Sequence, residues 1–242
     1  RLGMSTVDCL ILHWPGPPQE RRSTTYPDFG ANTLSLQQHV EKRLAMWRGL
    51  EHIYEQGGAR SIGVSNFSTA HLEALLPECR IRRESSEHPR PWHVVPPALT
   101  PVAPFCPYGR FCTAMVNQFK CCTTHAQREL VDYCQARGIV CVAYSPIAGS
   151  DLDAPKLAKV GAAHGKSPAA VVLRWLLQRG LVGIPCSSRA ERIASNRSEA
   201  DGWELSTAEG EGLAPAKAGE ARVVAVVMAR ARPAMEVEVA RV

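Results

Sequence analysis

The stretch Ala59-Arg60-Ser61-Ile62-Gly63-Val64-Ser65-Asn66-Phe67 has the pattern of a short buried strand that ends at polar residues just before a helix. Ile62 and Val64 are the apolar residues of this strand, and Ser65 and Asn66 follow them. At an isolated junction, Ser65 and Asn66 would be turn formers and a helix cap. The same arrangement recurs along the chain, and this recurrence favours a functional site.

The chain contains five apolar segments of this kind, and they alternate with helical patterns. This alternation is typical of βαβ units and a parallel sheet. The predicted strands and their polar ends are 6–14 with His13, 59–67 with Ser65 and Asn66, 114–119 with Asn117 and Gln118, 139–146 with Tyr144 and Ser145, and 181–185 with Ser187 and Ser188. A (β/α) barrel brings the carboxyl ends of all its strands to one face, which holds the active site. A doubly wound sheet needs such groups only at its switch point, and the chain has no G-x-G-x-x-G. We therefore predict a barrel.

Helices are predicted between these strands from apolar spacing and from capping residues. Thr124 and Gln127 form a T-x-x-Q pattern that predicts a capping box, and Ser206 and Glu209 form a second possible box. The expected helices cover about 36–56, 68–76, a segment that Gly138 closes, 157–164, a segment from Pro168 to Gly180, and a short segment with Arg189, Arg192 and Asn196.

Composition excludes several classes of protein. The chain has 242 residues, 45% of them hydrophobic, which suits one α/β domain. The net charge of +5 is mild and basic residues do not alternate with aromatics, so we expect no nucleic-acid partner. Nine scattered cysteines indicate reduced thiols in a cytoplasmic protein rather than disulfides or a zinc site. No apolar run is long enough to span a membrane.

Two segments do not fit the alternating pattern. Residues 81–113 contain seven prolines and no sustained period, which predicts a disordered insertion. The chain begins at Arg1, and Arg1-Leu2-Gly3 has the pattern of the last turn of a helix, which we interpret as the start of a fragment. The expected division is a barrel domain at 1–205, interrupted by this insertion, and an atypical C-terminal tail at 206–242.

Several separate blocks resemble one known family in the correct order. They are Leu10-Ile11-Leu12-His13-Trp14-Pro15-Gly16, residues 60–67, Val116-Asn117-Gln118, residues 138–146, His164-Gly165-Lys166-Ser167-Pro168 and residues 184–196. The chain resembles an aldo-keto reductase from its fourth barrel strand to its eighth. The resemblance implies a partial TIM (β/α)8 barrel that lacks the first three βα units. It also implies reduction of an aldehyde or ketone by hydride from NADPH, with NADH not excluded.

The resemblance assigns roles at the nicotinamide end of the site. His13 would hydrogen-bond the substrate carbonyl and orient it for hydride attack. Ser65, Asn66 and Gln118 match the residues that hold the nicotinamide carboxamide, and Asn117 is treated as their neighbour. Tyr144 matches the aromatic residue on which the nicotinamide stacks. Ser145 begins the loop, up to Ser150, that would cover the pyrophosphate.

At the other end of the cofactor, Ser187, Arg192 and Asn196 match the residues that bind the adenosine phosphate. A guanidinium binds a 2′-phosphate by charge-assisted, bidentate hydrogen bonds, so Arg192 favours NADP over NAD. Cys186 stands where the family usually has lysine, and Ser195 stands where it has an acidic or amide residue. The missing lysine should weaken binding of the 2′-phosphate, and Arg189 is a hypothetical replacement.

The family's catalytic tyrosine, lysine and aspartate match no residue of this sequence. We therefore expect the 242-residue chain to be inactive or unstable by itself. An alternative is a non-catalytic nucleotide-binding or regulatory protein of the same fold. A glycosidase would need two carboxylates at the strand ends, and none is found there. A metal-dependent hydrolase is disfavoured because His13 has no second histidine at ligand spacing.

Overall fold

The computed structural model describes residue 3 and residues 5–16, 35–80 and 115–213. The predicted insertion at 81–113, the predicted helix turn at residues 1–2 and the segment after 213 lie outside the described residues. No helix in the described ranges combines the length and the apolar run that a bilayer span requires.

The strands form one five-stranded sheet in which every neighbouring pair is parallel and the order follows the chain. The strands are β1 (Leu10–Leu12), β2 (Ile62–Ser65), β3 (Met115–Lys120), β4 (Val140–Tyr144) and β5 (Val182–Ile184). Right-handed crossovers that always advance in one direction put their helices on one face of the sheet. This order fits the predicted barrel type of winding and not a doubly wound sheet, whose strand order reverses.

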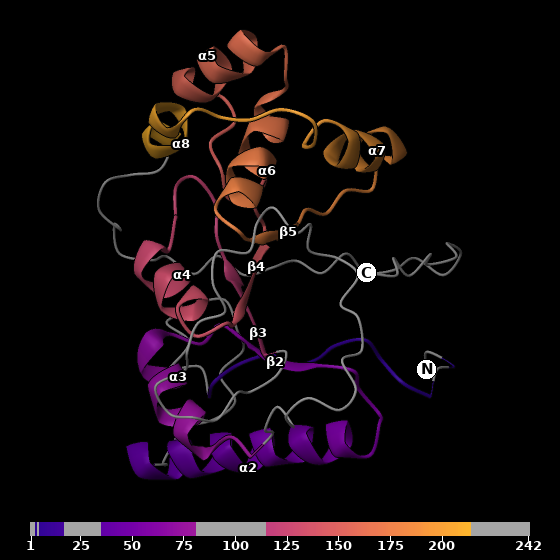
Figure 1. Ribbon diagram of the computed structural model, residues 1–242, viewed down its shortest axis with the longest axis vertical. Coiled ribbons are helices and arrows are strands. Elements are labelled where there is room, and N and C mark those ends of the chain that lie inside the picture. The colour runs from indigo at the N-terminus through magenta and orange to yellow at the C-terminus, as the bar shows by residue number, and fades with distance from the viewer. Residues whose placement is uncertain (1–2, 4, 17–34, 81–114, 214–242) are drawn as a thin grey trace.

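Helices connect the strands as the alternating pattern predicts. They are α2 (Leu36–Glu55), α3 (Thr69–Leu75) followed by the 3-10 turn η1 (Leu76–Glu78), α4 (Arg128–Gln135), α5 (Pro155–His164), α6 (Pro168–Gln178), α7 (Ala190–Ser198) and α8 (Thr207–Leu213). Figure 1 shows α2 at one end of the long axis and α5 to α8 at the other. The chain therefore advances along the molecule in sequence order.

Two helix starts are confirmed at the level of hydrogen bonds. The Ser167 hydroxyl accepts from the backbone N–H of Ala170 at 3.2 Å, just before Pro168. Ser206 and Glu209 form the reciprocal capping box at α8, with distances of 2.8 Å and 3.3 Å. Hydrogen bonds from the Ser206 hydroxyl, its backbone N–H and His164 lower the pKa of Glu209.

Two predicted boundaries are wrong. The first strand does not extend over 6–14, because Asp8 is exposed and bonds Arg60 at 3.1 Å, leaving Val7 with only an isolated bridge to Ala59. The T-x-x-Q capping box does not form. The Thr124 hydroxyl instead donates to the Gly149 carbonyl oxygen at 2.7 Å, and α4 begins only at Arg128.

The third strand is shifted by one residue from the predicted 114–119 and does not end at Asn117 and Gln118. It continues to Lys120, so Asn117 lies inside the strand and is fully buried. The Asn117 side chain donates to the Phe67 carbonyl oxygen at 3.1 Å and contacts Cys134 of α4. Asn117 therefore faces the helix layer and serves the packing of that layer.

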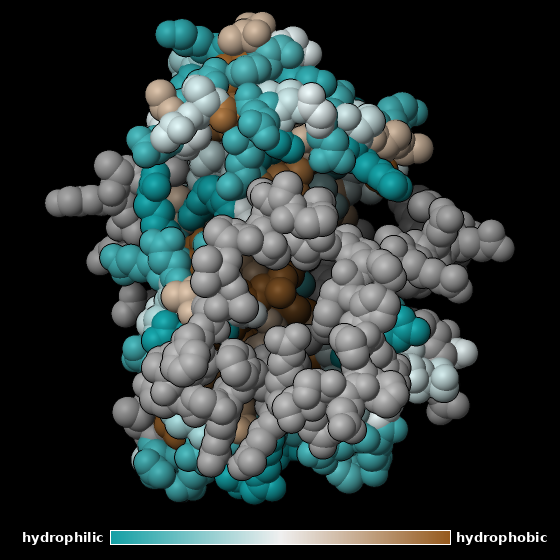
Figure 2. All heavy atoms as spheres, viewed as in Figure 1, coloured by the Kyte–Doolittle hydropathy of each residue, from teal (hydrophilic) through white to brown (hydrophobic). Residues whose placement is uncertain are grey.

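Strand alternation separates the two faces of the sheet. The face toward the helices contains the core, which includes Trp47, Ile62, Leu72, Phe119 and Trp175. The opposite face, which we call the inner face, contains the strand residues that alternate with those of the core. Three of its apolar side chains are exposed, Val140 by 44%, Val182 by 48% and Ile184 by 41%. Figure 2 shows hydrophobic residues near the centre of the view, where Figure 1 places β3 to β5.

Gly63 allows β2 and β3 to approach closely on the inner face. A Cβ at this position would lie 2.6 Å from the Val116 carbonyl oxygen, a backbone atom that cannot move without disturbing the sheet. Gly63→Ala should therefore lower the free energy of unfolding by about 1–3 kcal/mol. Gly49→Ala is the matched control, because a Cβ there meets nothing within 4 Å in the middle of α2. The control should raise stability by about 0.5–1 kcal/mol. Urea denaturation measures the free energy of unfolding of both variants. Equal stabilities of Gly63→Ala and Gly49→Ala would contradict the predicted clash at Gly63.

Candidate functional site

Five predicted site residues gather at the carboxyl ends of β1 to β4. We call His13, Ser65, Asn66, Gln118 and Tyr144 the strand-end cluster. Parallel pairing brings them together, because Ser65 is the register partner of Gln118 and their strands end at the same edge. Ser65 is 2% exposed and Tyr144 is 6% exposed, whereas His13 is exposed.

Asn66 joins the members of the strand-end cluster. Its Nδ2 donates to the His13 carbonyl oxygen and to Ser65 Oγ, both at 3.0 Å. Its Oδ1 accepts from the Tyr144 hydroxyl at 2.8 Å, and its backbone N–H donates to the Gln118 carbonyl oxygen at 2.8 Å. The Asn66 side chain thus fixes the ends of β1, β2 and β4 relative to each other. The backbone N–H of Asn66 bonds β3 to the same group.

The hydroxyl of Ser65 completes this network. It donates to the Gln118 carbonyl oxygen at 2.7 Å while accepting from Asn66. The His13 carbonyl oxygen can only accept, so it requires the Asn66 nitrogen on its side and leaves the amide oxygen toward the Tyr144 hydroxyl. The cluster therefore presents polar groups in fixed orientations, which is what recognition of a carboxamide requires.

The loop after β4 is fixed to the turn after β3. Ser145 has a left-handed backbone with φ of 51°, and its carbonyl oxygen accepts from the Gly149 N–H at 2.9 Å. The Gly149 carbonyl oxygen accepts from Thr124 Oγ1 at 2.7 Å and from Cys122 Sγ at 3.1 Å. Ser150 Oγ accepts from the Thr123 N–H at 3.2 Å. We call the loop 145–150 and the turn 121–125 together the rim.

One residue at the rim was missed by the sequence analysis. Lys120 is the last residue of β3 and shares the inner face with Gln118, because the two are separated by two positions in a strand. Lys120 lies one residue beyond the predicted strand 114–119, although the two-residue strand period would have found it. Burial, and then the positive charge of Lys120, lower the pKa of His125 in the neighbouring turn.

The remaining predicted site residues lie in the loop after β5, which contains Ser187, and on α7, which contains Arg192 and Asn196. Ser187 Oγ accepts from the Arg189 N–H at 3.1 Å, and Arg192 is exposed on α7. Asn196 lines a hollow of about 340 Å³ together with Gly183 and Pro185. These three residues share one local segment, and Cys186 is exposed beside them.

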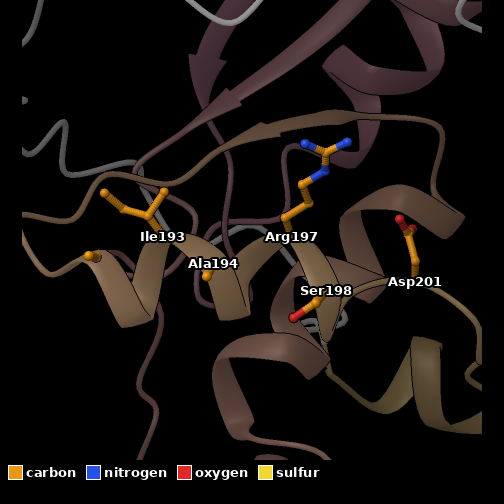
Figure 3. A pocket seen from close by; sticks show the side chains of 6 residues that line it. Ile193, Ala194, Arg197, Ser198 and Asp201 are labelled. Atoms are coloured by element: carbon orange, nitrogen blue, oxygen red, sulfur yellow. The ribbon is translucent and has the colours of Figure 1, made fainter. Parts of the chain in front are cut away.

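A larger hollow of about 640 Å³ lies along α7. Figure 3 shows Ile193 and Arg197 extending to the same side of this helix, as their spacing of four residues requires. None of the residues that line it is a predicted site residue. They are Ala190, Ile193, Ala194, Arg197, Ser198 and Asp201.

Comparison with known proteins gives consistent matches. A family profile described as "Aldo/keto reductase family" matches residues 1–210. The chain is 33% identical over 207 residues to the glyoxal reductase of Bacillus subtilis, covering 85% of this chain and 55% of that protein. It is 29% identical over 206 residues to aldo-keto reductase family 1 member A1 of Rattus norvegicus, covering 81% and 53%. The chain thus spans about half the length of these relatives.

Solved structures give the same result. An aldo-keto reductase of Bombyx mori in complex with NADP superposes with a TM-score of 0.62 at 26% identity. That match covers 88% of this chain and 58% of the other. An aldo-keto reductase complexed with NADPH superposes with a TM-score of 0.61 at 28% identity, covering 88% and 55%.

Asn66 has a left-handed backbone with φ of 63°, which glycine adopts without strain and alanine does not. Asn66→Ala and Asn66→Gly both lose the side-chain hydrogen bonds, so their difference isolates the backbone strain. We expect the alanine variant to be less stable than the glycine variant by about 1 kcal/mol in chemical denaturation. Ala45→Gly, in the middle of α2, is the control and should show the opposite order of alanine and glycine. Equal stabilities of the two Asn66 variants would refute the strained conformation.

Proposed function

Because this chain belongs to the aldo/keto reductase family, we propose that its protein reduces aldehydes or ketones to alcohols with NADPH. The observation that supports this most directly is the strand-end cluster, in which hydrogen bonds of Asn66 fix the ends of four neighbouring strands. The small polar groups of Ser65, Asn66 and Gln118 suit a nicotinamide carboxamide, which has one acceptor and two donors. Bound NADPH would supply the hydride.

Each residue of the cluster has a distinct role in the proposal. Ser65, Asn66 and Gln118 hold the carboxamide and so determine which face of the nicotinamide is presented. Tyr144 offers its ring as a stacking surface, and its hydroxyl keeps the Asn66 amide in one orientation. His13, exposed at the end of β1, donates a hydrogen bond to the substrate carbonyl and orients its carbon for attack.

The proposal assigns no general acid to this sequence, because the family's catalytic tyrosine, lysine and aspartate match none of its residues. A positioned general acid contributes about 10²–10⁴-fold to the rate. The chain also spans only about half the length of its curated relatives. We accordingly assign no proton donor to this sequence, and we expect the 242-residue chain alone to be inactive.

The test is NADPH oxidation by the full-length protein with a panel of aldehydes and ketones. We expect turnover that requires NADPH, and a fall of about 10²-fold in kcat for His13→Ala with little change in NADPH affinity. His52→Ala, at the exposed end of α2, is the matched histidine control and should leave kcat unchanged. Tight NADPH binding without turnover of any carbonyl would instead support the non-catalytic, regulatory alternative. Failure to bind NADPH would reject both functions.

The adenosine end of the proposed site gives an independent prediction. Ser187, Arg192 and Asn196 bind the adenosine phosphate in this proposal, and Cys186 lies beside them without a charge where the family usually has lysine. Cys186→Lys should raise NADPH affinity about tenfold and leave NADH affinity nearly unchanged, because an ammonium adds a charge-assisted hydrogen bond only to the 2′-phosphate. Cys186→Ser is the uncharged control. Fluorescence titrations measure the affinity of each variant for NADPH and for NADH. An equal gain in affinity for NADH would contradict the assignment.

A further inference from the structure

Lys120 places an ammonium group beside the strand-end cluster. It is the register partner of Tyr144, so its side chain leaves the sheet on the inner face next to that ring. Gln118 precedes it on the same face, and Lys120 lies one step further toward the carboxyl edge. Its side chain is partly buried, whereas lysine side chains are usually exposed. The fold therefore directs this lysine to the mouth of the proposed site.

The rim holds the stem of Lys120 in place. A Cβ at Gly149 would lie 3.1 Å from Lys120 Cε and 2.8 Å from the Ser145 carbonyl oxygen, so the lysine stem packs against a glycine that has no room for a side chain. Hydrogen bonds of Thr124 and Cys122 fix the Gly149 carbonyl. The end of the Lys120 stem therefore lies against the loop 145–150.

The charge of Lys120 is not balanced within the part of the chain that the structure describes. No ion pair found among residues 5–16, 35–80 and 115–213 includes Lys120, and no hydrogen bond from its side chain is found there. The neighbouring His125 cannot balance this charge, because an imidazole is either neutral or positive. An anionic oxygen near this ammonium would form a charge-assisted hydrogen bond, and a ligand at the strand ends can supply that oxygen.

We propose that Lys120 binds an anionic oxygen group, a phosphate or a carboxylate, of a ligand bound between the strand-end cluster and the rim. This inference rests on the proposed function, which puts a dinucleotide and a carbonyl substrate at this edge. The anion is then either the pyrophosphate of the cofactor, which the loop 145–150 would cover, or a carboxylate on the substrate. In both cases the residue distinguishes charged ligands from neutral ones.

The experiment uses Lys120→Met in the full-length protein to distinguish the two possible anions, the cofactor pyrophosphate and a substrate carboxylate. Methionine keeps an unbranched stem against Gly149, so the variant tests the charge rather than the packing. NADPH affinity is measured by fluorescence titration at several salt concentrations. In parallel, kcat/KM is compared for 4-carboxybenzaldehyde and for benzaldehyde, which lacks the anion. Lys120→Arg retains the charge, and Lys159→Met removes an exposed lysine of α5 as the matched control.

Loss of one charge-assisted hydrogen bond corresponds to about a tenfold or larger effect. If the pyrophosphate is the partner, NADPH affinity falls by about this factor and its salt dependence becomes weaker. If a substrate carboxylate is the partner, NADPH affinity stays constant and only kcat/KM for 4-carboxybenzaldehyde falls. Either result, with Lys120→Arg close to wild type and Lys159→Met unchanged, supports the proposal. If wild type binds NADPH and neither quantity changes in Lys120→Met, the proposal is rejected while the proposed function stands. A wild-type protein that does not bind NADPH rejects both.

Discussion

Parallel pairing of the five strands in chain order is the constraint on which the rest of the structure depends. Each strand must be connected to the next by a right-handed crossover, so the helices lie on one face of the sheet. The inner face, on the opposite side, has none of these helices. The same pairing aligns all carboxyl ends at one edge. Residues separated by more than fifty positions, such as His13 and Asn66, therefore become hydrogen-bonding neighbours.

Asn66 converts this alignment into a rigid arrangement. Its side-chain amide bonds the His13 carbonyl oxygen after β1 and the Tyr144 hydroxyl of β4, and its backbone N–H bonds Gln118 of β3. A left-handed backbone at a residue other than glycine stores strain, and such residues concentrate where function needs a fixed geometry. The strain is offset by the hydrogen bonds that the conformation allows. The stability of this edge and the orientation of its polar groups thus have the same physical source.

The sequence predicted the strands and most helices because their signals are local. The apolar run around Ile62, the Ser167-Pro168 start of α6 and the Ser206–Glu209 capping box need no tertiary information. Gathering of the strand-end cluster followed from the topology, once the alternation of strands and helices was recognised. Thr124 was wrongly predicted to cap a helix. Its hydroxyl bonds the carbonyl oxygen of Gly149, which is distant in the sequence, and local capping rules do not consider such partners. Asn117 was grouped with the polar strand end although alternation puts it on the face opposite Gln118, and Lys120 was missed because the predicted strand ended one residue before it.

The two faces of the sheet also differ in what stabilises them. The helix-side face is packed, with Ile62, Phe119 and Trp175 in the core, whereas Val140, Val182 and Ile184 on the inner face are substantially exposed. Parallel sheets are normally covered on both faces, so the described elements complete only one layer of the packing. The strand-end cluster is nevertheless formed, because its bonds join the ends of β1 to β4 to each other and need no covering layer. In the proposed function, orientation of the cofactor amide would therefore depend on hydrogen bonds within the sheet, while exclusion of water from a reacting carbonyl would depend on packing against the inner face.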